Sequence, residues 1–405
     1  MKPHRAICAA LVTLTTVCVR GEELMDRVDQ ALTFSGYDDQ VRARFSGLLD
    51  LEYYQFSREA PGLIYTDRSS LVNPRLSLFF DAQAGPNIYI FAQARVDRGF
   101  DPADSSMEAR LDEYALRWTP WDDGRFSMQA GCFGTIVGNY VERHMSWENP
   151  FINAPLIYEN VTGIYDSEAP SDASYFADGT MDAKYDYNPV IWGPSYATGL
   201  SVSGKLGEFE YAAEIKNAGL SSRPESWAAS DRGFDKPTVS ARLAWHPDMA
   251  WKLGVSASEG PYFTEHADYS LPPGKALGDY KQYVLGQDIS FAWDHWQLWA
   301  EVYEARFDVP YVGHADTIGY YIEAKYKFTP SLSGALRWNQ QLFADVPDGV
   351  GGERPWGNDL SRMDAGMIYR FTPYTQLKLQ YSVQDEKRVD DAISHLFAAQ
   401  FTLRF

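Results

Sequence analysis

Apolar and polar residues alternate along most of the chain with a period of two. In residues 395–405, for example, Phe397, Phe401 and Phe405 fall on one parity, and Gln400 and Arg404 fall on the other. Successive side chains of a β-strand point to opposite faces, so this alternation predicts strands with one apolar and one polar face. We predict sixteen such strands, at 41–56, 75–84, 88–98, 108–118, 125–133, 197–206, 209–217, 238–246, 249–258, 281–293, 296–307, 317–328, 331–340, 362–371, 374–384 and 395–405.

The connections between these strands alternate between short and long. The short ones are 85–87, 119–124, 207–208, 247–248, 294–295, 329–330 and 372–373, and the long ones are 57–74, 99–107, 134–196, 218–237, 259–280, 308–316, 341–361 and 385–394. A tilted strand crosses a bilayer in about 9–11 residues, and tight turns at one end with long loops at the other are typical of transmembrane barrels. The sequence therefore predicts an all-β, antiparallel, up-and-down transmembrane β-barrel. The alternative, a soluble β-sandwich, gives no reason for sorted loops.

Aromatic residues stand beside the short turns. The pattern of an aromatic residue, Thr or His, and then Pro occurs at 118–120, 245–247, 328–330 and 371–373. Proline ends strand pairing because it lacks an N–H group, and amphipathic rings favour the membrane–water interface. We predict an aromatic girdle that contains Trp118, Trp245, Trp251, Phe328 and Phe371. The alternative is a set of ordinary strand-ending prolines beside core aromatics.

The strand positions that alternate with the apolar ones carry many charged residues. The basic residues among them on the early strands form a predicted basic wall, which consists of Arg42, Arg44, Arg75, Arg95 and Arg125. A dry core does not hold so many charges, because burial of an unpaired charge costs several kcal/mol. Sixteen strands enclose enough space for an aqueous channel, so we expect water inside the barrel. The alternative is that these positions form the solvated outer face of a soluble sheet.

Residues 134–196 form the longest connection, and they are acidic. They contain nine Asp and Glu residues against Arg143 and Lys184. A long segment of this kind is usually functional. Its position resembles that of the third outer loop of general porins, and this resemblance implies that it folds inward and constricts the barrel. Acids facing the basic wall set up a field across a narrow passage; alternatively, they lie on the outer surface and hold divalent ions. The candidate constriction acids are Glu148, Glu159, Asp166, Glu168 and Asp182.

The N-terminal residues predict export. Residues 1–21 have a basic start, an apolar stretch and small residues before Glu22, which is the pattern of a signal peptide. Residues 22–40 contain a helical apolar pattern at Leu24, Val28 and Leu32, and we interpret them as a periplasmic N-terminal segment. Residues 41–405 then form the barrel domain.

Charge and cysteine content narrow the function classes. The formal charge is −19, and loss of Lys2, Arg5 and Arg20 with the signal peptide lowers it to −22. Phosphate binding needs a basic surface, so nucleic acid is not an expected partner. Only Cys132 remains after residue 21, which excludes an internal disulfide.

The strand number, the loop sorting, the long third loop and the terminal Phe resemble those of sixteen-stranded bacterial outer-membrane porins. The stretch Gln129-Ala130-Gly131-Cys132-Phe133 is similar to a strand end of phosphate-selective porins, whereas the Pro-Glu-Phe-Gly-Gly run of the enterobacterial trimeric porins is missing from the third loop. The resemblance implies that Phe401 and Phe405 belong to an assembly signal, read by the barrel assembly machinery.

The resemblance implies an outer-membrane channel for passive diffusion of small hydrophilic solutes and ions. A substrate-specific channel, for carbohydrates or for anions such as phosphate, remains the alternative. No His has a Ser or Asp at catalytic spacing and no G-x-S-x-G run occurs, so we expect neither an enzyme nor a cofactor or metal site. Expected partners are outer-membrane lipids and the diffusing solutes. Monomer and homotrimer stay open, because a lipid face and a subunit interface are both apolar.

Overall fold

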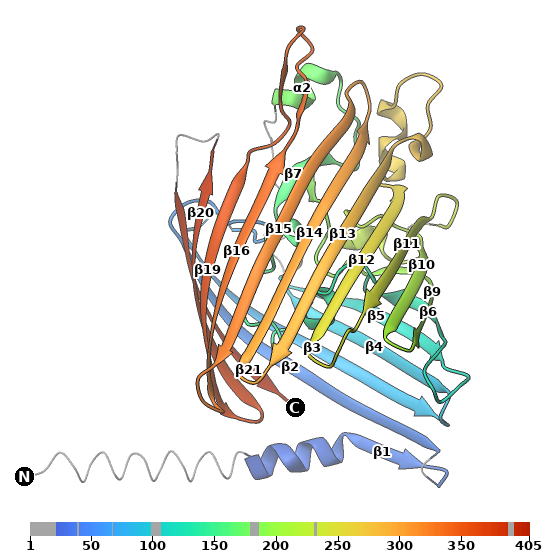
Figure 1. Cartoon of the computed structure of the whole chain (residues 1–405), viewed down its shortest axis with the longest axis vertical. Coiled ribbons are helices and arrows are strands. Elements are labelled where there is room, and N and C mark those ends of the chain that lie inside the picture. The colour runs from blue at the N-terminus through green and yellow to red at the C-terminus, as the bar shows by residue number, and fades with distance from the viewer. Residues whose placement is uncertain are drawn as a thin grey trace, which may run out of the picture.

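The computed structural model describes residues 22–38, 40–66, 68–98, 107–178, 186–230, 233–387 and 393–405. One closed antiparallel sheet dominates the chain (Figure 1). Its sixteen long strands are β2 (Val41–Phe56), β3 (Ser70–Ala84), β4 (Ile88–Asp97), β5 (Glu108–Trp118), β6 (Ser127–Phe133), β9 (Ala197–Leu206), β10 (Phe209–Lys216), β11 (Thr238–Trp245), β12 (Trp251–Pro261), β13 (Lys281–Trp293), β14 (Trp296–Val309), β15 (Gly313–Lys327), β16 (Leu332–Phe343), β19 (Leu360–Thr372), β20 (Thr375–Glu386) and β21 (Ser394–Arg404). The predicted all-β, sixteen-stranded barrel is confirmed.

The barrel closes between its first and last long strands. β2 pairs with β3 on one side and with β21 on the other, with Leu48 opposite Arg404. Phe405 continues this seam, because its N–H donates to Gly47 and its carbonyl accepts from the Gly47 N–H. A Cβ atom on Gly47 would lie 2.4 Å from the Phe405 ring, so the glycine leaves room for the terminal ring. The closed seam leaves no open sheet edge along these residues.

A short strand, β1 (Thr33–Gly36), covers the part of β2 that β21 does not reach. β1 pairs with residues 41–44 of β2. Residues 22–31 form a helix before it, and Asp29 of this helix makes an ion pair of 2.7 Å with Arg44. The period-two pattern did not predict β1, because a four-residue strand is too short to show a clear alternation.

Several predicted strand bounds differ from the observed ones. β3 begins at Ser70 rather than at 75, and β6 begins at Ser127 rather than at 125. A bulge lies opposite Gln93 and Ala94 of β4, where Asp112 is the extra residue on β5. A bulge shifts the parity of the residues beyond it, which is why the stretch 108–118 alternates imperfectly.

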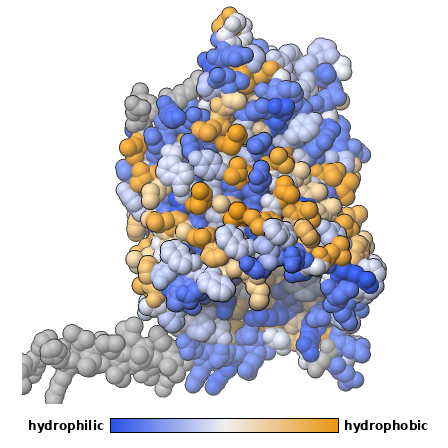
Figure 2. All heavy atoms as spheres, viewed as in Figure 1, coloured by the Kyte–Doolittle hydropathy of each residue, from blue (hydrophilic) through white to orange (hydrophobic). Residues whose placement is uncertain are grey.

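Apolar residues form a belt across the middle of the outer face seen in Figure 2, between two more polar ends. The five predicted girdle residues lie on this outer face at the turn end, and their exposed fractions range from 38% for Trp251 to 58% for Phe328. The opposite parity is polar and mostly buried, including Asp50, Glu301 and Arg337. Hydrocarbon accepts exposed apolar side chains at no cost, so the exposed apolar belt fits a lipid-facing surface.

The long loops carry small elements of their own. These are η1 (Val141–Arg143), η2 (Leu156–Tyr158), β7 (Val161–Tyr165), α2 (Ala173–Asp178), β8 (Tyr187–Pro189), η4 (Pro224–Ser226), η5 (Glu265–Ser270), η6 (Leu277–Asp279), β17 (Asp345–Pro347) and β18 (Glu353–Pro355). β7 pairs with β8, and β17 pairs with β18. Among the described residues, no helix is long and apolar enough to cross a bilayer.

Candidate functional site: a polar passage beside residues 134–196

The 134–196 segment binds buried polar side chains on the inner face of the barrel wall. Glu301 of β14 accepts hydrogen bonds from the backbone N–H groups of Asn139 and Tyr140 and from the Tyr158 hydroxyl, the last at 2.7 Å. Tyr158 also lies 2.7 Å from the hydroxyl of Tyr303. One carboxylate of the wall therefore holds two separate stretches of the segment.

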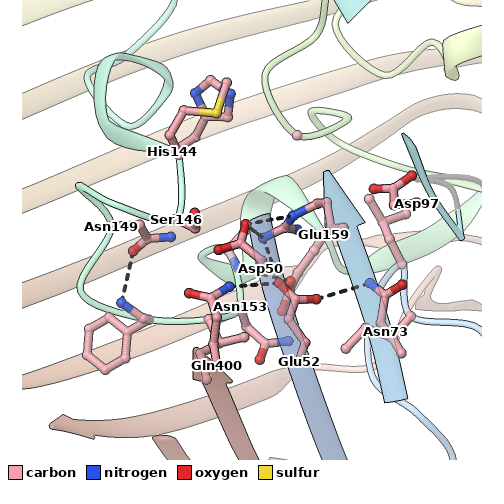
Figure 3. A pocket seen from close by; sticks show the side chains of 18 of the residues that line it. Asp50, Glu52, Asn73, Asp97, His144, Ser146, Asn149, Asn153, Glu159 and Gln400 are labelled. Atoms are coloured by element: carbon pink, nitrogen blue, oxygen red, sulfur yellow. Dashed lines mark hydrogen bonds and ion pairs between the residues drawn. The ribbon is translucent and has the colours of Figure 1, made fainter. Parts of the chain in front are cut away.

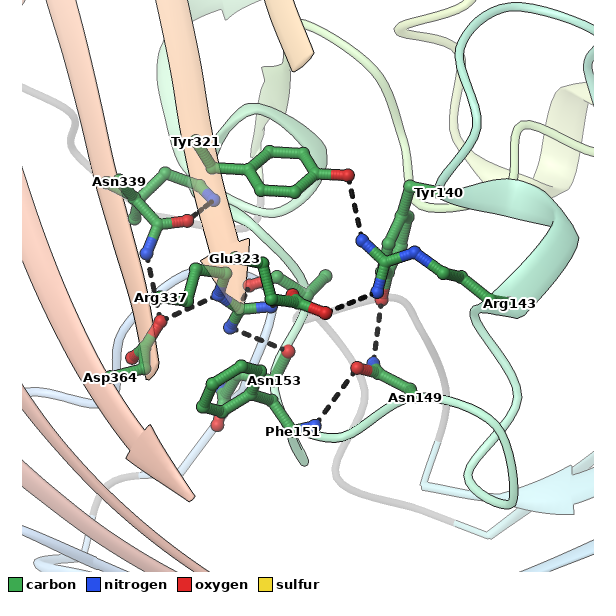
Figure 4. A network of polar contacts seen from close by, with 12 residues as sticks. Tyr140, Arg143, Asn149, Phe151, Asn153, Tyr321, Glu323, Arg337, Asn339 and Asp364 are labelled. Atoms are coloured by element: carbon green, nitrogen blue, oxygen red, sulfur yellow. Dashed lines mark hydrogen bonds and ion pairs between the residues drawn. The ribbon is translucent and has the colours of Figure 1, made fainter. Parts of the chain in front are cut away.

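A row of buried charges of alternating sign joins the same segment to β15, β16 and β19 (Figure 4). Arg143 Nη1 lies 2.6 Å from Glu323, and Arg337 lies 3.5 Å from Glu323 and 2.9 Å from Asp364. Arg362 follows, at 3.0 Å from Asp364, and it also pairs with Glu159 of the segment. Each buried charge thus has a partner of opposite sign, which offsets the cost of its desolvation.

Backbone groups of the segment are bound as well. Arg337 Nη2 donates to the carbonyls of Asn153 and Ala154 at 3.0 and 3.2 Å. Gln380 of β20 accepts from the N–H of Ile152 at 2.6 Å, and Gln376 donates to the carbonyl of Ser146 at 2.8 Å. Because irregular backbone needs hydrogen-bond partners wherever it is buried, these wall side chains stabilise residues 146–154 in one conformation.

The other edge of the segment borders a cavity of about 150 Å³ (Figure 3). The wall across this cavity belongs to β2, β3 and β4. Apolar residues such as Leu48, Leu71 and Ile152 contribute to the lining. Its charged and polar residues are Asp50, Glu52, Asn73, Arg75, Arg95 and Asp97 from the wall, and His144, Ser146, Asn149, Asn153 and Glu159 from the segment. We call this cavity between the segment and the early strands the polar passage, after the charged groups on both of its sides.

Two members of the predicted basic wall line this passage, and both are paired with acids of the wall itself. Arg75 lies 3.1 Å from Asp50 and 2.6 Å from Glu52. Arg95 lies 2.5 Å from Asp97. The passage therefore presents alternating charges along the wall instead of a uniformly basic surface.

The other three predicted basic residues lie away from the passage. Arg42 and Arg44 are exposed near the turn end of β2, where Arg44 pairs with Asp29. Arg125 lies in the turn before β6, 4.4 Å from the centre of the Trp121 ring and 3.3 Å from Asp123.

The predicted constriction acids occupy different environments. Glu159 lines the passage and pairs with Arg362. Asp166 is buried between loops, where it accepts from Asn188 at 2.9 Å, whereas Glu168 is exposed on the loop side. Glu148 lies on the turn side of the segment, and partial burial raises the pKa of its carboxyl. Asp182 lies outside the described residues.

A second hollow, of about 680 Å³, lies on the turn side of the segment. Glu142 and Glu148 of the segment line it together with Lys325, Lys327 and Arg370 of β15 and β19. An acidic segment thus faces a basic wall here. The bases come from late strands, because the turn-side edge of the segment lies against these strands rather than against β2–β4.

His144 is a passage residue that the sequence pattern did not single out. Its Nδ1 lies 2.6 Å from the Val141 carbonyl, which only accepts, so Nδ1 carries the proton and Nε2 accepts from the Tyr196 hydroxyl at 2.8 Å. Burial, helped by the nearby charges of Arg95 and Arg75, lowers the pKa of His144 to about 4. A lone histidine in a loop gives no spacing signal, so only the contacts identify it.

Comparisons with known proteins agree on the fold. No family model matches the chain, and no curated protein matches it. The trimer form of OmpT, an outer-membrane protein of Vibrio cholerae, aligns over 91% of this chain and 100% of its own with a TM-score of 0.56 and 9% identity. Salmonella typhi OmpF, solved with daunomycin, aligns over 92% and 100% with a TM-score of 0.57 and 14% identity. An anion-selective porin from Comamonas acidovorans aligns over 90% and 100% with a TM-score of 0.56 and 9% identity.

Proposed function

We propose that this protein is an outer-membrane porin, a water-filled channel for passive diffusion of small hydrophilic solutes and ions. The observation that carries the proposal is the polar passage between residues 134–196 and β2–β4, inside a closed barrel of sixteen strands. An apolar outer belt and a charged interior are what a channel in lipid requires. The shared fold with outer-membrane porins supports the same function. The proposal includes no enzymatic activity.

We infer that residues 134–196 are the constriction of this channel. The ion pairs of Arg143 and Glu159 with the wall hold the segment at one edge, which keeps the opposite edge at a fixed distance from β2–β4. A cavity of about 150 Å³ holds only a few water-sized molecules. The channel therefore favours ions and small polar solutes over large ones.

A second candidate is a channel specific for anions such as phosphate. The observation that favours it is the group of Lys325, Lys327 and Arg370 on one side of the turn-side hollow. Three basic groups raise the local concentration of anions, although Glu142 and Glu148 oppose them across the same hollow.

Single-channel recording in planar bilayers tests both candidates. Passive diffusion predicts a linear current in KCl that millimolar phosphate and maltose leave unchanged. A current that phosphate blocks in a concentration-dependent way supports the anion-specific channel. If folded protein inserts but carries no current, the porin proposal is wrong.

We propose that the mature protein begins at Glu22, lies in the outer membrane and forms a homotrimer like the trimer form of OmpT. Membrane fractionation, N-terminal sequencing and native mass spectrometry of the detergent-solubilised protein test these three points. A mature N-terminus at any residue other than Glu22 contradicts the first point. An inner-membrane location contradicts the second, and a monomeric mass contradicts the third.

A further inference from the structure

An aromatic pocket lies among the loops, apart from the passage. Its volume is about 450 Å³, and β7, β8, α2 and the residues after β12 surround it. Figure 1 places β7 and α2 towards the loop end of the barrel. The aromatic side chains that line it are Tyr165, Tyr175, Phe176, Tyr187, Tyr262 and Phe263.

These rings line the pocket from several directions. Tyr262 and Phe263 are 1% exposed and their ring centres are 4.3 Å apart, so they form a fixed base. Tyr165 and Tyr187 pack at 5.7 Å across the β7–β8 hairpin. Tyr175 is 51% exposed, which places it at the rim. A pocket of this size with several ring faces fits a ligand with an apolar or aromatic body.

Two acids also line the pocket. Glu168 and Asp186 line it, and its described lining residues include no Lys, Arg or His. Two basic side chains bind backbone groups beside it: Arg223 donates to the Asp186 carbonyl at 3.0 Å, and Arg354 donates to the Ser174 carbonyl at 3.2 Å. Arg223 also binds Asn188 at 2.9 Å and lies 3.6 Å from Asp166. Burial and the charge of Asp186 raise the pKa of Tyr165, as expected where negative potential disfavours a phenolate.

We propose that this pocket binds a small organic cation with an apolar or aromatic body, such as a quaternary ammonium compound. Tyrosine faces attract cations through the ring quadrupole, and two carboxylates add attraction in a partly desolvated site. A neutral sugar can stack on the rings but gains nothing from the carboxylates, and an anion is repelled. The pocket goes beyond the proposed channel function, because binding there does not require conduction.

Isothermal titration calorimetry of the full-length, detergent-solubilised protein tests the proposal. The probe is benzyltrimethylammonium, with benzyl alcohol and maltose as neutral comparisons. We expect saturable binding of the cation and none of the neutral compounds at the same concentration. Equal binding of benzyl alcohol, binding of maltose alone, or no binding of the cation overturns the proposal. Loss of conductance leaves this result unchanged, so the two proposals fail separately.

Variants locate the binding. Tyr175→Ala should weaken cation binding about fivefold, the effect of a cation–π contact near 1 kcal/mol, and Tyr175→Phe should retain it. Glu168→Gln should weaken binding by a similar factor. Glu265→Gln is the matched control, because Glu265 is an exposed acid of another loop-side element and does not line the pocket. If Glu265→Gln weakens binding as much as Glu168→Gln, general surface charge attracts the cation and the pocket assignment is wrong.

Discussion

Both edges of the 134–196 segment face charged residues of the barrel wall, but these charges have different partners at the two edges. At the edge that faces β14–β20, charges pair between the segment and the wall, as in Arg143–Glu323 and Glu159–Arg362. At the edge that faces β2–β4, the wall charges pair with one another, as in Arg75–Asp50 and Arg95–Asp97. Charges that pair across an interface hold it closed, whereas charges already paired within a wall make no ion pair with the facing segment. The passage therefore lies on the side where the charges of the wall pair with one another.

The largest expected loss of stability comes from breaking the ion pairs at the edge that faces β14–β20. Arg337→Met leaves Glu323 and Asp364 buried with one partner fewer, and removal of one member of a buried network costs about 3–5 kcal/mol. We expect a lower midpoint of heat-induced unfolding and faster proteolysis within residues 134–196.

The matched control for this variant is Arg306→Met. Arg306 pairs with Asp316 at 2.7 Å on the exposed outer side of the barrel, where an ion pair contributes about 0–1 kcal/mol. Equal losses of stability in the two variants would show that the buried row of charges does not hold the segment.

The next effect concerns pH. A half-buried His144 with a pKa of about 4 is neutral in the folded segment, whereas a released His titrates near 6.5. The released state then binds more protons, so the stability of the packed segment falls as pH falls from about 6.5 to 4. The loss is at most about 3 kcal/mol, from 1.36 kcal/mol per pH unit, and partial exposure of the ring reduces it.

Proteolysis of residues 134–196 at pH 7 and pH 5 measures this loss. We expect faster cleavage at pH 5, and His144→Gln should make the rate less dependent on pH. The exposed His314 supplies the control through His314→Gln, which should keep the wild-type pH profile. An unchanged profile in His144→Gln would assign the pH effect to other groups.

Ion selectivity, a different readout, tests the passage edge. Arg75→Ser leaves the carboxylates of Asp50 and Glu52 facing the passage without their cation, so selectivity should shift towards cations. One unit charge at about 4 Å in water corresponds to about 1 kcal/mol, or roughly fivefold in the permeability ratio. Reversal potentials in a KCl gradient measure the shift. Arg125→Ser, in the exposed turn before β6, should leave the ratio unchanged, and an equal shift there would place the selective region outside the passage.

The smallest change in stability is expected for the ion pair of the segment on its turn side. Glu142 lies 3.1 Å from Lys252 of β12 and is largely exposed, so Glu142→Gln should change the unfolding midpoint by less than the equivalent of about 1 kcal/mol. A loss comparable to that of Arg337→Met would mean that the segment is held from both edges.

The period-two pattern alone predicted the barrel, because the face of each strand residue follows from its neighbours in the sequence. A period of two assigns each residue of β14 or β16 to one face from its immediate neighbours, and the sorted loops then give the strand number. The positions of Trp118 and Trp245 at the turn end follow from the same pattern, since both residues end a strand. The pattern missed β1, which is too short to show a period, and the bulge at Asp112, where one extra residue interrupts it.

The sequence by itself determined which residues of most strands face outward and which face inward, because alternation is a property of consecutive residues. Only the tertiary structure decided which inward charges pair with one another. Glu159 pairs with Arg362, which is 203 positions away, and Arg75 pairs with Asp50 on the neighbouring strand. The same residue types could have paired in other combinations, and the path of residues 134–196 through the barrel selects one of them. That path depends on contacts between distant parts of the chain, which no local pattern encodes.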